Sequence, residues 1–367
     1  MEIRPSVKHG IISRTPDTFF RYHGWPTVCR DEDGVLYAAA SAYRVSHICP
    51  FGKTVLWKST DEGETWSLPT VVNDTFLDDR DAGIVSLGGK KLLVSWFCHP
   101  ASAYETRWHD YIIEAWPGAE SVLEMYKTLP EDKRQGGSYI RVSEDGGETW
   151  GETVKVPVSA PHGPIQLKDG SLLYAGKRMY AGPDETGEAP EDYCDESMEV
   201  WKGSSDGKEW TLLAKLVPPE GTFLKNFHEL HAIELDDGRI LCVIRAQGPE
   251  VAHGFTMYQT YSDDGGHTWS PLTCIGVSGS PPHLMKHSSG AIVLSFGRRE
   301  EPYGERALVS RDNGATWEDE YVLCEVSPRD LGYPSSVELS DGSILTVYYQ
   351  GYGDDPFASV LYTRWHL

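Results

Sequence analysis

The chain has 367 residues, of which 40% are hydrophobic and 24% charged, and its mean hydropathy is −0.40. This composition is typical of a folded globular protein and excludes a disordered chain. Lys and Arg number 33 against 55 Asp and Glu, a formal net charge of −22, which argues against nucleic acid or an anionic membrane as a partner. No apolar run reaches the ~18 residues that a membrane helix needs.

The cysteines and the N-terminal residues indicate the cellular compartment. Seven cysteines are scattered along the chain without a CxxC pair, so we expect free thiols rather than disulfides or structural zinc. The first residues, MEIRPSVKHG, contain no hydrophobic stretch after their charges. No secretory signal is visible there, and we therefore expect a cytoplasmic protein.

Six hairpins are predicted in chain order, each from two short apolar runs joined by a turn that ends in glycine. The turn glycines are Gly34, Gly89, Gly170, Gly238, Gly290 and Gly342. The runs are rich in strand-forming residues, and no convincing long helical period separates them. Six such units of four short strands predict an all-β fold, a six-bladed β-propeller, with residues 1–367 as a single domain. We expect the ring to be closed by pairing between the two chain ends.

An octet of the form S-x-D-x-G-x-T-W follows most of these hairpins. Full copies begin at Ser59, Ser143, Ser262 and Ser310, and a copy shortened by one residue begins at Ser204. The pattern predicts a tight turn in which the Asp accepts backbone N–H groups and the Gly supplies a positive φ. The Trp is expected to pack beneath the turn.

Two segments interrupt the repeat. An insertion is expected at about 100–137, and its portion EAWPGAESVLEMYKTL is a candidate helix. The acidic stretch 181–199 is expected to be a solvated loop.

Polar residues recur where the first strand of each blade begins, next to the propeller axis. Nine residues before the turn glycines stand Trp25, Arg80, Pro161, Glu229, Pro281 and Tyr333. Their close neighbours are His23, Asp79, Asp81, His162, His228, His231 and His283. One histidine at an exposed strand end would indicate little, but so many titratable groups around one axis favour a ligand site.

The octet resembles the Asp-box, or BNR repeat, of the sialidase (neuraminidase) superfamily, and the resemblance covers nearly the whole chain. It implies a six-bladed propeller and a carbohydrate partner. Because non-enzymatic propellers also carry such boxes, the activity must be inferred from the residues of the site.

Segments around the axis resemble those that carry catalysis in sialidases. The segment LGYPSSVELSDGSIL resembles the one with the nucleophilic tyrosine, which would be Tyr333, and NFHELHAIELDDGRILCVIR the one with the activating glutamate, which would be Glu229. Arg245 and Arg298, with Arg299 as an alternative to the latter, match two of three arginines that hold the substrate carboxylate. A neutral tyrosine avoids the repulsion between that carboxylate and an Asp or Glu nucleophile, and arginine binds carboxylates through two hydrogen bonds.

The chain departs from the family pattern at the first arginine. Where sialidases have Arg-Ile-Pro, this sequence has Gly24-Trp25-Pro26. Arg80 at the equivalent strand of blade two is the nominated replacement, with Arg21 and His23 as alternatives. The last blade likewise ends in Gln350 where sialidases have a glutamate.

A second departure concerns the general acid. Arg44 matches an auxiliary arginine of the family, and the acidic Asp should follow it closely, but the loop offers His47 instead. Either His47 donates the proton, or Asp79 or Asp81 reaches in from blade two. A histidine with a pKa near 6.5 is a competent acid close to neutrality.

The sequence therefore predicts an exo-glycosidase of the sialidase type that releases a terminal acidic sugar from a glycan. A variant is an eliminating uronide lyase, and the alternative class is a non-catalytic propeller that stacks a glycan on Trp25 or Tyr333. The predicted catalytic residues are Tyr333, Glu229, His47 and Asp81. The predicted substrate-binding residues are Arg44, Arg80, Arg245, Arg298, His23, Trp25, His162, His231 and His283. No metal and no nucleotide cofactor are expected, because His228 and His231 fall in a strand and no glycine-rich loop opens a helix.

Overall fold

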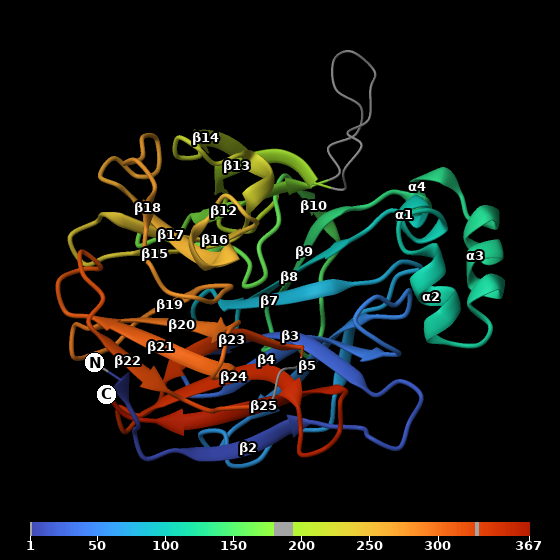
Figure 1. Cartoon of the computed structure of the whole chain (residues 1–367), viewed down its shortest axis with the longest axis horizontal. Coiled ribbons are helices and arrows are strands. Elements are labelled where there is room, and N and C mark those ends of the chain that lie inside the picture. The colour runs from blue at the N-terminus through green and yellow to red at the C-terminus, as the bar shows by residue number, and fades with distance from the viewer. Residues whose placement is uncertain (1, 180–193, 327–329) are drawn as a thin grey trace.

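The computed structural model describes residues 2–179, 194–326 and 330–367. Its strands form six sheets that are arranged as the blades of a β-propeller (Figure 1). In each sheet one edge strand lies innermost, and inner-strand contacts join blades four, five, six, one and two around the axis. The predicted fold class is confirmed.

Each blade has four antiparallel strands, which follow one another from the axis outwards. Blade one contains β3 (Tyr22–Arg30), β4 (Leu36–Arg44), β5 (Lys53–Ser59) and β6 (Thr70–Asn73), and blade two contains β7 (Arg80–Ser86), β8 (Leu92–Cys98), β9 (Gly137–Ser143) and β10 (Val154–Val156). Blade three contains β11 (Ile165–Gln166), β12 (Leu172–Met179), β13 (Cys194–Gly203) and β14 (Trp210–Leu216), and blade four contains β15 (Phe227–Glu234), β16 (Ile240–Gln247), β17 (Phe255–Ser262) and β18 (Thr273–Cys274). Blade five contains β19 (His283–Lys286), β20 (Ile292–Arg298), β21 (Gly304–Ser310) and β22 (Asp319–Val322), and blade six contains β23 (Leu331–Glu338), β24 (Ile344–Gly351), β25 (Ala358–Trp365) and β2 (Lys8–Ser13).

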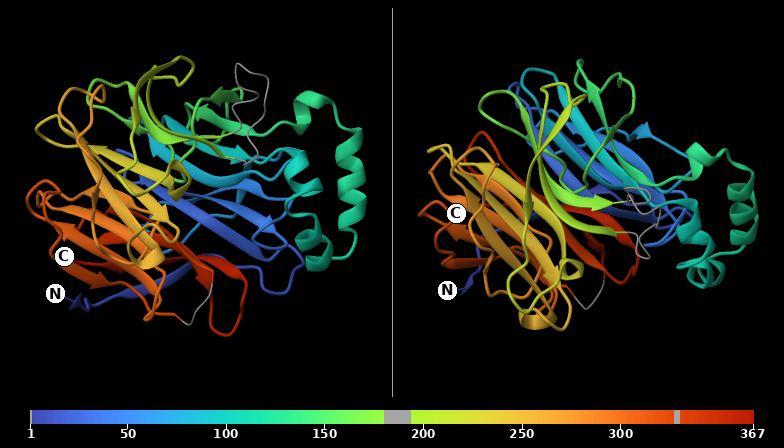
Figure 2. Two further views of the ribbon diagram at one scale, coloured as in Figure 1. Left: turned by 45° about the horizontal axis from the view of Figure 1, so that its top comes forward. Right: turned by 90° about the horizontal axis from the view of Figure 1, so that it is seen from above.

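The two chain ends close the ring. Strand β2 pairs antiparallel with β25, with Lys8 opposite Arg364, and the short β1 (Glu2–Ile3) pairs parallel with β22. Both termini accordingly lie together at one side of the molecule (Figure 2). The predicted pairing between the chain ends is confirmed, and it ties the last blade to the first residues of the chain.

The octets form turns at the ends of the third strands, on the outer part of the blades. In the first copy the Asp61 carboxylate accepts the backbone N–H of Thr65 at 2.9 Å and its hydroxyl at 2.5 Å, and Gly63 has a φ of 84°. The Trp66 ring packs against the apolar cluster between blades six and one. The predicted turn chemistry is therefore present, and it lies away from the axis.

Four helices fill the insertion in blade two. They are α1 (Ala101–Glu105), α2 (His109–Ala115), α3 (Ala119–Thr128) and α4 (Glu131–Arg134), and they stand at one side of the propeller (Figure 1). The candidate helix in this insertion is therefore present, although it is divided between α2 and α3, where Gly118 adopts a φ of 90°. Short 3₁₀ turns also occur at Leu224–Asn226 and Ala252–Gly254.

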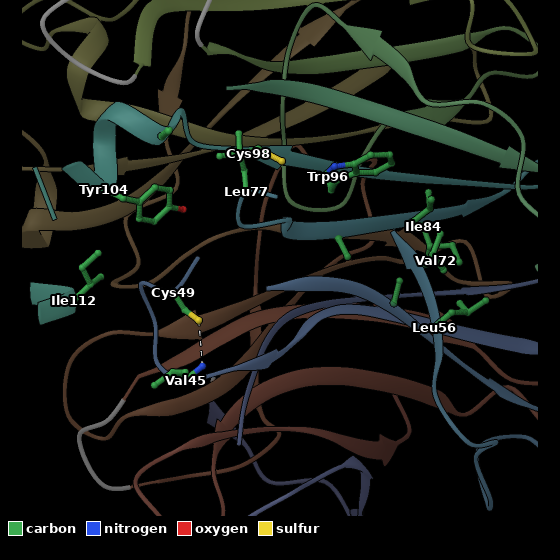
Figure 3. Close-up of a cluster of buried hydrophobic side chains, with 14 of the residues drawn as sticks. Val45, Cys49, Leu56, Val72, Leu77, Ile84, Trp96, Cys98, Tyr104 and Ile112 are labelled. Atoms are coloured by element: carbon green, nitrogen blue, oxygen red, sulfur yellow. Dashed lines mark hydrogen bonds between the residues drawn. The ribbon is translucent and has the colours of Figure 1, made fainter. Parts of the chain in front are cut away.

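The insertion packs onto the core between blades one and two. Tyr104 and Ile112 are fully buried and join a cluster that includes Cys49 and Cys98 (Figure 3). Since α1 follows β8 directly, this packing places the helices at the end of the propeller where the inner strands begin. The six cysteines whose side chains the structure describes are free thiols.

Two further sequence expectations concern the remaining segments. Of the acidic stretch 181–199, residues 181–193 lie outside the described part, and β13 begins at Cys194, so a loop over the last six positions is wrong. None of the helices in the described ranges is long and apolar enough to cross a membrane.

Candidate active site

Tyr333, Glu229 and Arg245 form a hydrogen-bonded triangle beside the axis. The Tyr333 hydroxyl donates to Glu229 Oε1 at 2.5 Å, and Arg245 Nη1 donates to both Glu229 oxygens at 2.8 and 2.6 Å. Arg245 Nη1 also lies 3.0 Å from the Tyr333 oxygen, while Nη2 donates to Gln247 at 2.6 Å. Tyr333 lies near the start of β23, Glu229 near the start of β15 and Arg245 near the end of β16. Three sequence-predicted residues thus meet in one contact.

The electrostatics of this triangle keep one shared proton in place. Burial raises the pKa of Glu229, but Arg245 and the Tyr333 hydroxyl outweigh it, so the pKa is lowered. Burial and the Glu229 carboxylate raise the pKa of Tyr333 well above 10. The resting pair is therefore a neutral phenol donating to a carboxylate, which can take the proton when the phenol oxygen reacts.

Tyr333, Trp25 and Asp81 share an unusual backbone conformation in three consecutive blades. Their φ angles are 53°, 53° and 51°, and a register shift of the inner hairpin accompanies each. Bulky residues rarely adopt positive φ, and such strain is typical of functional sites. A β-bulge changes the direction in which a side chain points. The bulges therefore turn the Tyr333 phenol, the Trp25 indole and the Asp81 carboxyl toward the end of the axis where the inner strands begin, which we call the mouth. In blade two the equivalent of Tyr333 is thus Asp81 rather than Arg80.

Asp81 is a buried carboxyl beside Glu229. Burial raises its pKa to about 7, against the opposing charge of Arg80. Its Oδ1 atom is buried without a described hydrogen-bond partner, and the side chain borders a cavity of about 60 Å³ together with Glu229 and Lys177. Asp81 can therefore offer a proton to a ligand oxygen near neutral pH. Asp79 cannot, because its carboxylate is fully buried and accepts hydrogen bonds from Asn73, Thr75 and Cys98 instead.

Arg44 and Arg80 converge on Trp25 but share a carboxylate that the sequence did not single out. Arg44 pairs with Asp78 through both terminal nitrogens, and Arg80 Nη1 lies 3.3 Å from Asp78 Oδ2. Their guanidinium carbons lie 4.6 and 4.1 Å from the Trp25 ring centroid. Tyr104 of α1 also points its hydroxyl at Asp78, at 3.4 Å. Because Asp78 takes these donors, the expected replacement clamp is only partly available to a substrate.

Arg298 does not lie beside Tyr333 and Arg245, whereas its alternative Arg299 does. Arg298 pairs with Glu320 at 3.2 Å and with Glu300 at 3.4 Å, on the side of the blade away from Tyr333. Arg299 lies 5.5 Å from the Phe255 ring, which Arg245 also faces at 4.7 Å. Its Nη2 lies 3.0 Å from the place that a Cβ on Gly332 would occupy, directly before Tyr333. Successive residues at a strand end point to opposite sides, which explains why the two neighbours differ.

His47 lies at the mouth within a network of two tyrosines and a carboxylate. Its Nδ1 is 2.6 Å from Asp330 Oδ2 and 3.1 Å from the Tyr22 hydroxyl, and Tyr349 donates to Asp330 Oδ1 at 2.7 Å. The His47 ring stands 5.0 Å from Trp25, and 43% of its side chain is exposed. Nothing in the sequence pattern distinguished Asp330, which comes three residues before Tyr333 but belongs to no recognised motif.

Comparisons with known proteins agree with this architecture. A model of the BNR repeat-like domain matches residues 178–352. No curated protein matches the sequence. A protein of unknown function from Dyadobacter fermentans has a TM-score of 0.74 at 20% identity, over 99% of this chain and 100% of that one. The chain thus carries BNR-like repeats over residues 178–352 and shares its overall fold with that structure.

Two sialidase-type structures share the same fold. The NanB sialidase of Streptococcus pneumoniae has a TM-score of 0.70 at 14% identity, over 98% of this chain and 70% of that one. The intramolecular trans-sialidase of Ruminococcus gnavus, in complex with oseltamivir carboxylate, has a TM-score of 0.64 at 15% identity, over 95% of both chains.

The remaining predicted histidines lie elsewhere in this sialidase-like propeller. His23 is fully buried between Ser13 Oγ and Thr15 Oγ1, beside Trp57, and does not face the mouth. His23 lies on the inner strand β3, and the register shifts on both sides of Gly24 turn its ring away from the side that Trp25 faces.

His162, His231 and His283 lie on the axis, but in a layer below Tyr333 and Glu229. Their rings are 4.5 to 5.6 Å apart and line a cavity of about 380 Å³ that runs along all six inner strands. Burial lowers the pKa of each, so they are neutral at physiological pH. His231 and His283 come two residues after the aligned positions Glu229 and Pro281. Residues two apart on a strand face the same side at successive depths, so the alignment of the six hairpins could not separate this lower layer from the mouth. Within the described ranges, no group of His, Cys, Asp and Glu has metal-binding geometry.

Proposed function

We propose that the protein is an exo-glycosidase of the sialidase type, acting on a terminal acidic sugar. The observation that carries this proposal is the Tyr333–Glu229 contact of 2.5 Å, held by Arg245. Tyr22 and Tyr349 also donate to a carboxylate, that of Asp330, but only in the Tyr333 pair does one guanidinium, that of Arg245, contact both the phenol oxygen and the carboxylate. This is the arrangement that a tyrosine nucleophile needs.

In the first step the Tyr333 oxygen forms a bond to the anomeric carbon while its proton passes to Glu229. The glycosidic bond breaks, and its electron pair goes to the leaving oxygen, which takes a proton from His47. In the second step water attacks the anomeric carbon and gives a proton to His47. As the bond to water forms, the bond to Tyr333 breaks with its electron pair going to the phenol oxygen, which regains its proton from Glu229. Two displacements at one carbon retain its configuration.

Arg299 and Arg245 are the groups proposed to bind the substrate carboxylate. Arg299 forms no ion pair with a carboxylate in the described part of the chain, and it lies on the Tyr333 side of blade five. Trp25 stands where sialidases carry their first arginine, and it is covered by Arg44 and Arg80. We therefore expect this carboxylate to be held by two arginines rather than three, with Asp81 donating to a sugar hydroxyl.

A panel of methylumbelliferyl glycosides of sialic and uronic acids tests the proposal. Release of the fluorophore with retention of configuration, followed by proton NMR, is expected for at least one acidic sugar. A fluorinated substrate analogue that forms a slowly hydrolysed intermediate should label Tyr333, as read by peptide mass spectrometry. An unsaturated product would indicate elimination instead, and binding without turnover would indicate a lectin-like propeller; either result would refute hydrolysis.

A further inference from the structure

We propose that Asp330 is a positioning residue that makes His47 the proton-transferring group of this site. The inference rests on the proposed glycosidase and concerns a residue outside the Tyr333–Glu229–Arg245 triangle. His47 comes from the loop after β4 in blade one, and Asp330 directly precedes β23 in blade six. The two side chains meet across the blade boundary, with 2.6 Å between His47 Nδ1 and Asp330 Oδ2.

Asp330 is itself held on both carboxylate oxygens. Tyr349 donates to Oδ1 at 2.7 Å, and the Tyr22 hydroxyl donates to Oδ2. Burial raises the pKa of Asp330, but the hydrogen bonds from His47, Tyr22 and Tyr349 outweigh it and lower the pKa below its usual range. Asp330 therefore stays ionised at any working pH and offers a fixed acceptor to the imidazole.

The main chain of His47 is fixed as well. Its carbonyl oxygen accepts from Arg44 Nη2 at 2.9 Å and from Arg80 Nη1 at 2.8 Å. Two arginines that the sequence assigned to substrate binding thus support the His47 loop. Asp330 orients the imidazole of His47, and the two guanidinium groups hold its main chain. Of the side chain, 43% remains exposed, so a ligand can reach it.

This arrangement decides which imidazole nitrogen can exchange a proton. An ionised carboxylate can only accept, so Nδ1 keeps its hydrogen toward Asp330, and Nε2 is the nitrogen that exchanges protons. In the imidazolium form Nε2–H protonates the leaving glycosidic oxygen, which takes the electron pair of the broken C–O bond. The resulting neutral Nε2 then accepts the proton of the attacking water. Loss of a carboxylate that orients a metal-binding histidine typically costs 10–100-fold in metal affinity or activity, and we expect a loss of activity of at least this order for His47.

The charges around His47 set the pH at which it works. Burial lowers its pKa below 6.5, the nearby Arg80 and Arg44 lower it further, and Asp330 opposes them. His99 of blade two interacts electrostatically with His47, and burial and Arg80 lower its pKa well below 6.5, so it is neutral. The acid form of His47 therefore accumulates below neutrality, and hydrolysis should fall as pH rises through the His47 pKa.

Asp330→Asn tests the proposal. With ¹⁵N-histidine labelling, we expect the His47 pKa to decrease and its Nδ1–H tautomer to lose its preference, because the acceptor loses its charge. In kinetics, the alkaline limb of kcat/KM should move to lower pH, and alkyl glycosides should lose about 10–100-fold. Activated aryl glycosides should change by less than about threefold, because their leaving groups scarcely need protonation.

Three controls keep the outcome decisive. Asp341→Asn, which removes a carboxylate paired with Arg364 at the far end of blade six, should leave both readouts unchanged. Tyr349→Phe removes one donor from Asp330, makes it a stronger acceptor, and should raise the His47 pKa even if Asp330→Asn fails to fold. In a His47→Ala background, Asp330→Asn should cost nothing further, as expected for a residue that acts through His47.

The two proposals can fail separately. An unmoved His47 pKa and alkaline limb in Asp330→Asn, in an enzyme that hydrolyses glycosides, would overturn the role of Asp330 alone. A shifted His47 pKa in a protein that cleaves no acidic glycoside would overturn the proposed glycosidase activity and the proposed proton transfer by His47. Only the orientation of the imidazole by Asp330 would then remain supported.

Discussion

Trp25 and Tyr333 occupy the same strand position in adjoining blades, both with a φ of 53°, and their rings meet edge to face at 6.4 Å. The position that presents the proposed nucleophile in blade six thus presents an indole in blade one. Trp25 is 1% exposed and lies under two guanidinium groups, so it supports the mouth rather than opening it. An arginine there would place a third cation beside Arg44 and Arg80, which already share the Asp78 carboxylate.

Trp25→Ala should therefore destabilise the whole mouth. Loss of a buried indole typically costs about 3–5 kcal/mol, and the stacking of two cations adds to this. Urea unfolding followed by circular dichroism would measure the change in the free energy of unfolding. Trp25→Phe, which keeps an aromatic face, should cost clearly less; equal losses in both variants would mean that the contacts with Arg44 and Arg80 contribute nothing.

Tyr333→Phe separates catalysis from binding. Only the hydroxyl that contacts Glu229 and Arg245 is removed, so the ring still packs against Trp25 and Tyr349. We expect hydrolysis to be lost and the dissociation constant for an acidic sugar, measured by calorimetry, to change by less than about tenfold, or ~1.4 kcal/mol. Substantial activity in Tyr333→Phe would exclude the tyrosine nucleophile.

Arg299 and Arg298 provide a matched pair of variants. Arg299→Ala should raise KM for a carboxylated substrate by about 10–100-fold, because a charged hydrogen bond contributes about 1.5–3 kcal/mol. Arg298→Ala removes a guanidinium that already pairs with Glu320 and Glu300, so steady-state kinetics should barely change. The reverse order of effects would show that the carboxylate binds on the other side of blade five.

Arg298 and Arg299 also show which features of the site could be predicted from the sequence. The hairpin glycines and octets predicted the fold because their turn chemistry is local: Asp61 contacts residues only four positions away or fewer. The triangle of Tyr333, Glu229 and Arg245 was accessible through motifs. The sequence could not show which arginine at the end of β20 faces this triangle, because a shift of one residue in the strand register reverses the side to which each side chain points.

The carboxylates that organise the mouth were beyond reach for a different reason. Asp78 and Asp330 act through partners from other blades, Arg44 and His47, and no spacing in the sequence encodes those pairings. The depth of His162, His231 and His283 below the mouth depends likewise on how the inner strands stack around the axis. The residue types predicted a polar site on the axis. Only the three-dimensional structure shows that this site consists of a mouth with Tyr333 and Glu229 and a separate layer of histidines below it.

Glu305 in β21 should make stability fall as pH rises. Its side chain is fully buried, neither oxygen has a described hydrogen-bond partner, and burial raises its pKa to about 8 despite Arg299 and Arg306. In the unfolded chain this carboxyl titrates near its ordinary value of about 4.5. The folded state therefore binds more protons between those two values, and stability decreases across that interval, by on the order of a few kcal/mol.

Glu305→Gln should abolish this dependence. The amide is nearly isosteric and uncharged, so the variant should match the wild type at about pH 4 and exceed its free energy of unfolding at about pH 8. Urea denaturation at a series of pH values measures both curves. Glu300→Gln, on the exposed partner of Arg298 in the same blade, serves as the control and should follow the wild type. A Glu305→Gln variant that is less stable than the wild type at the alkaline end would mean that the buried carboxylate is ionised and stabilised by Arg299 and Arg306.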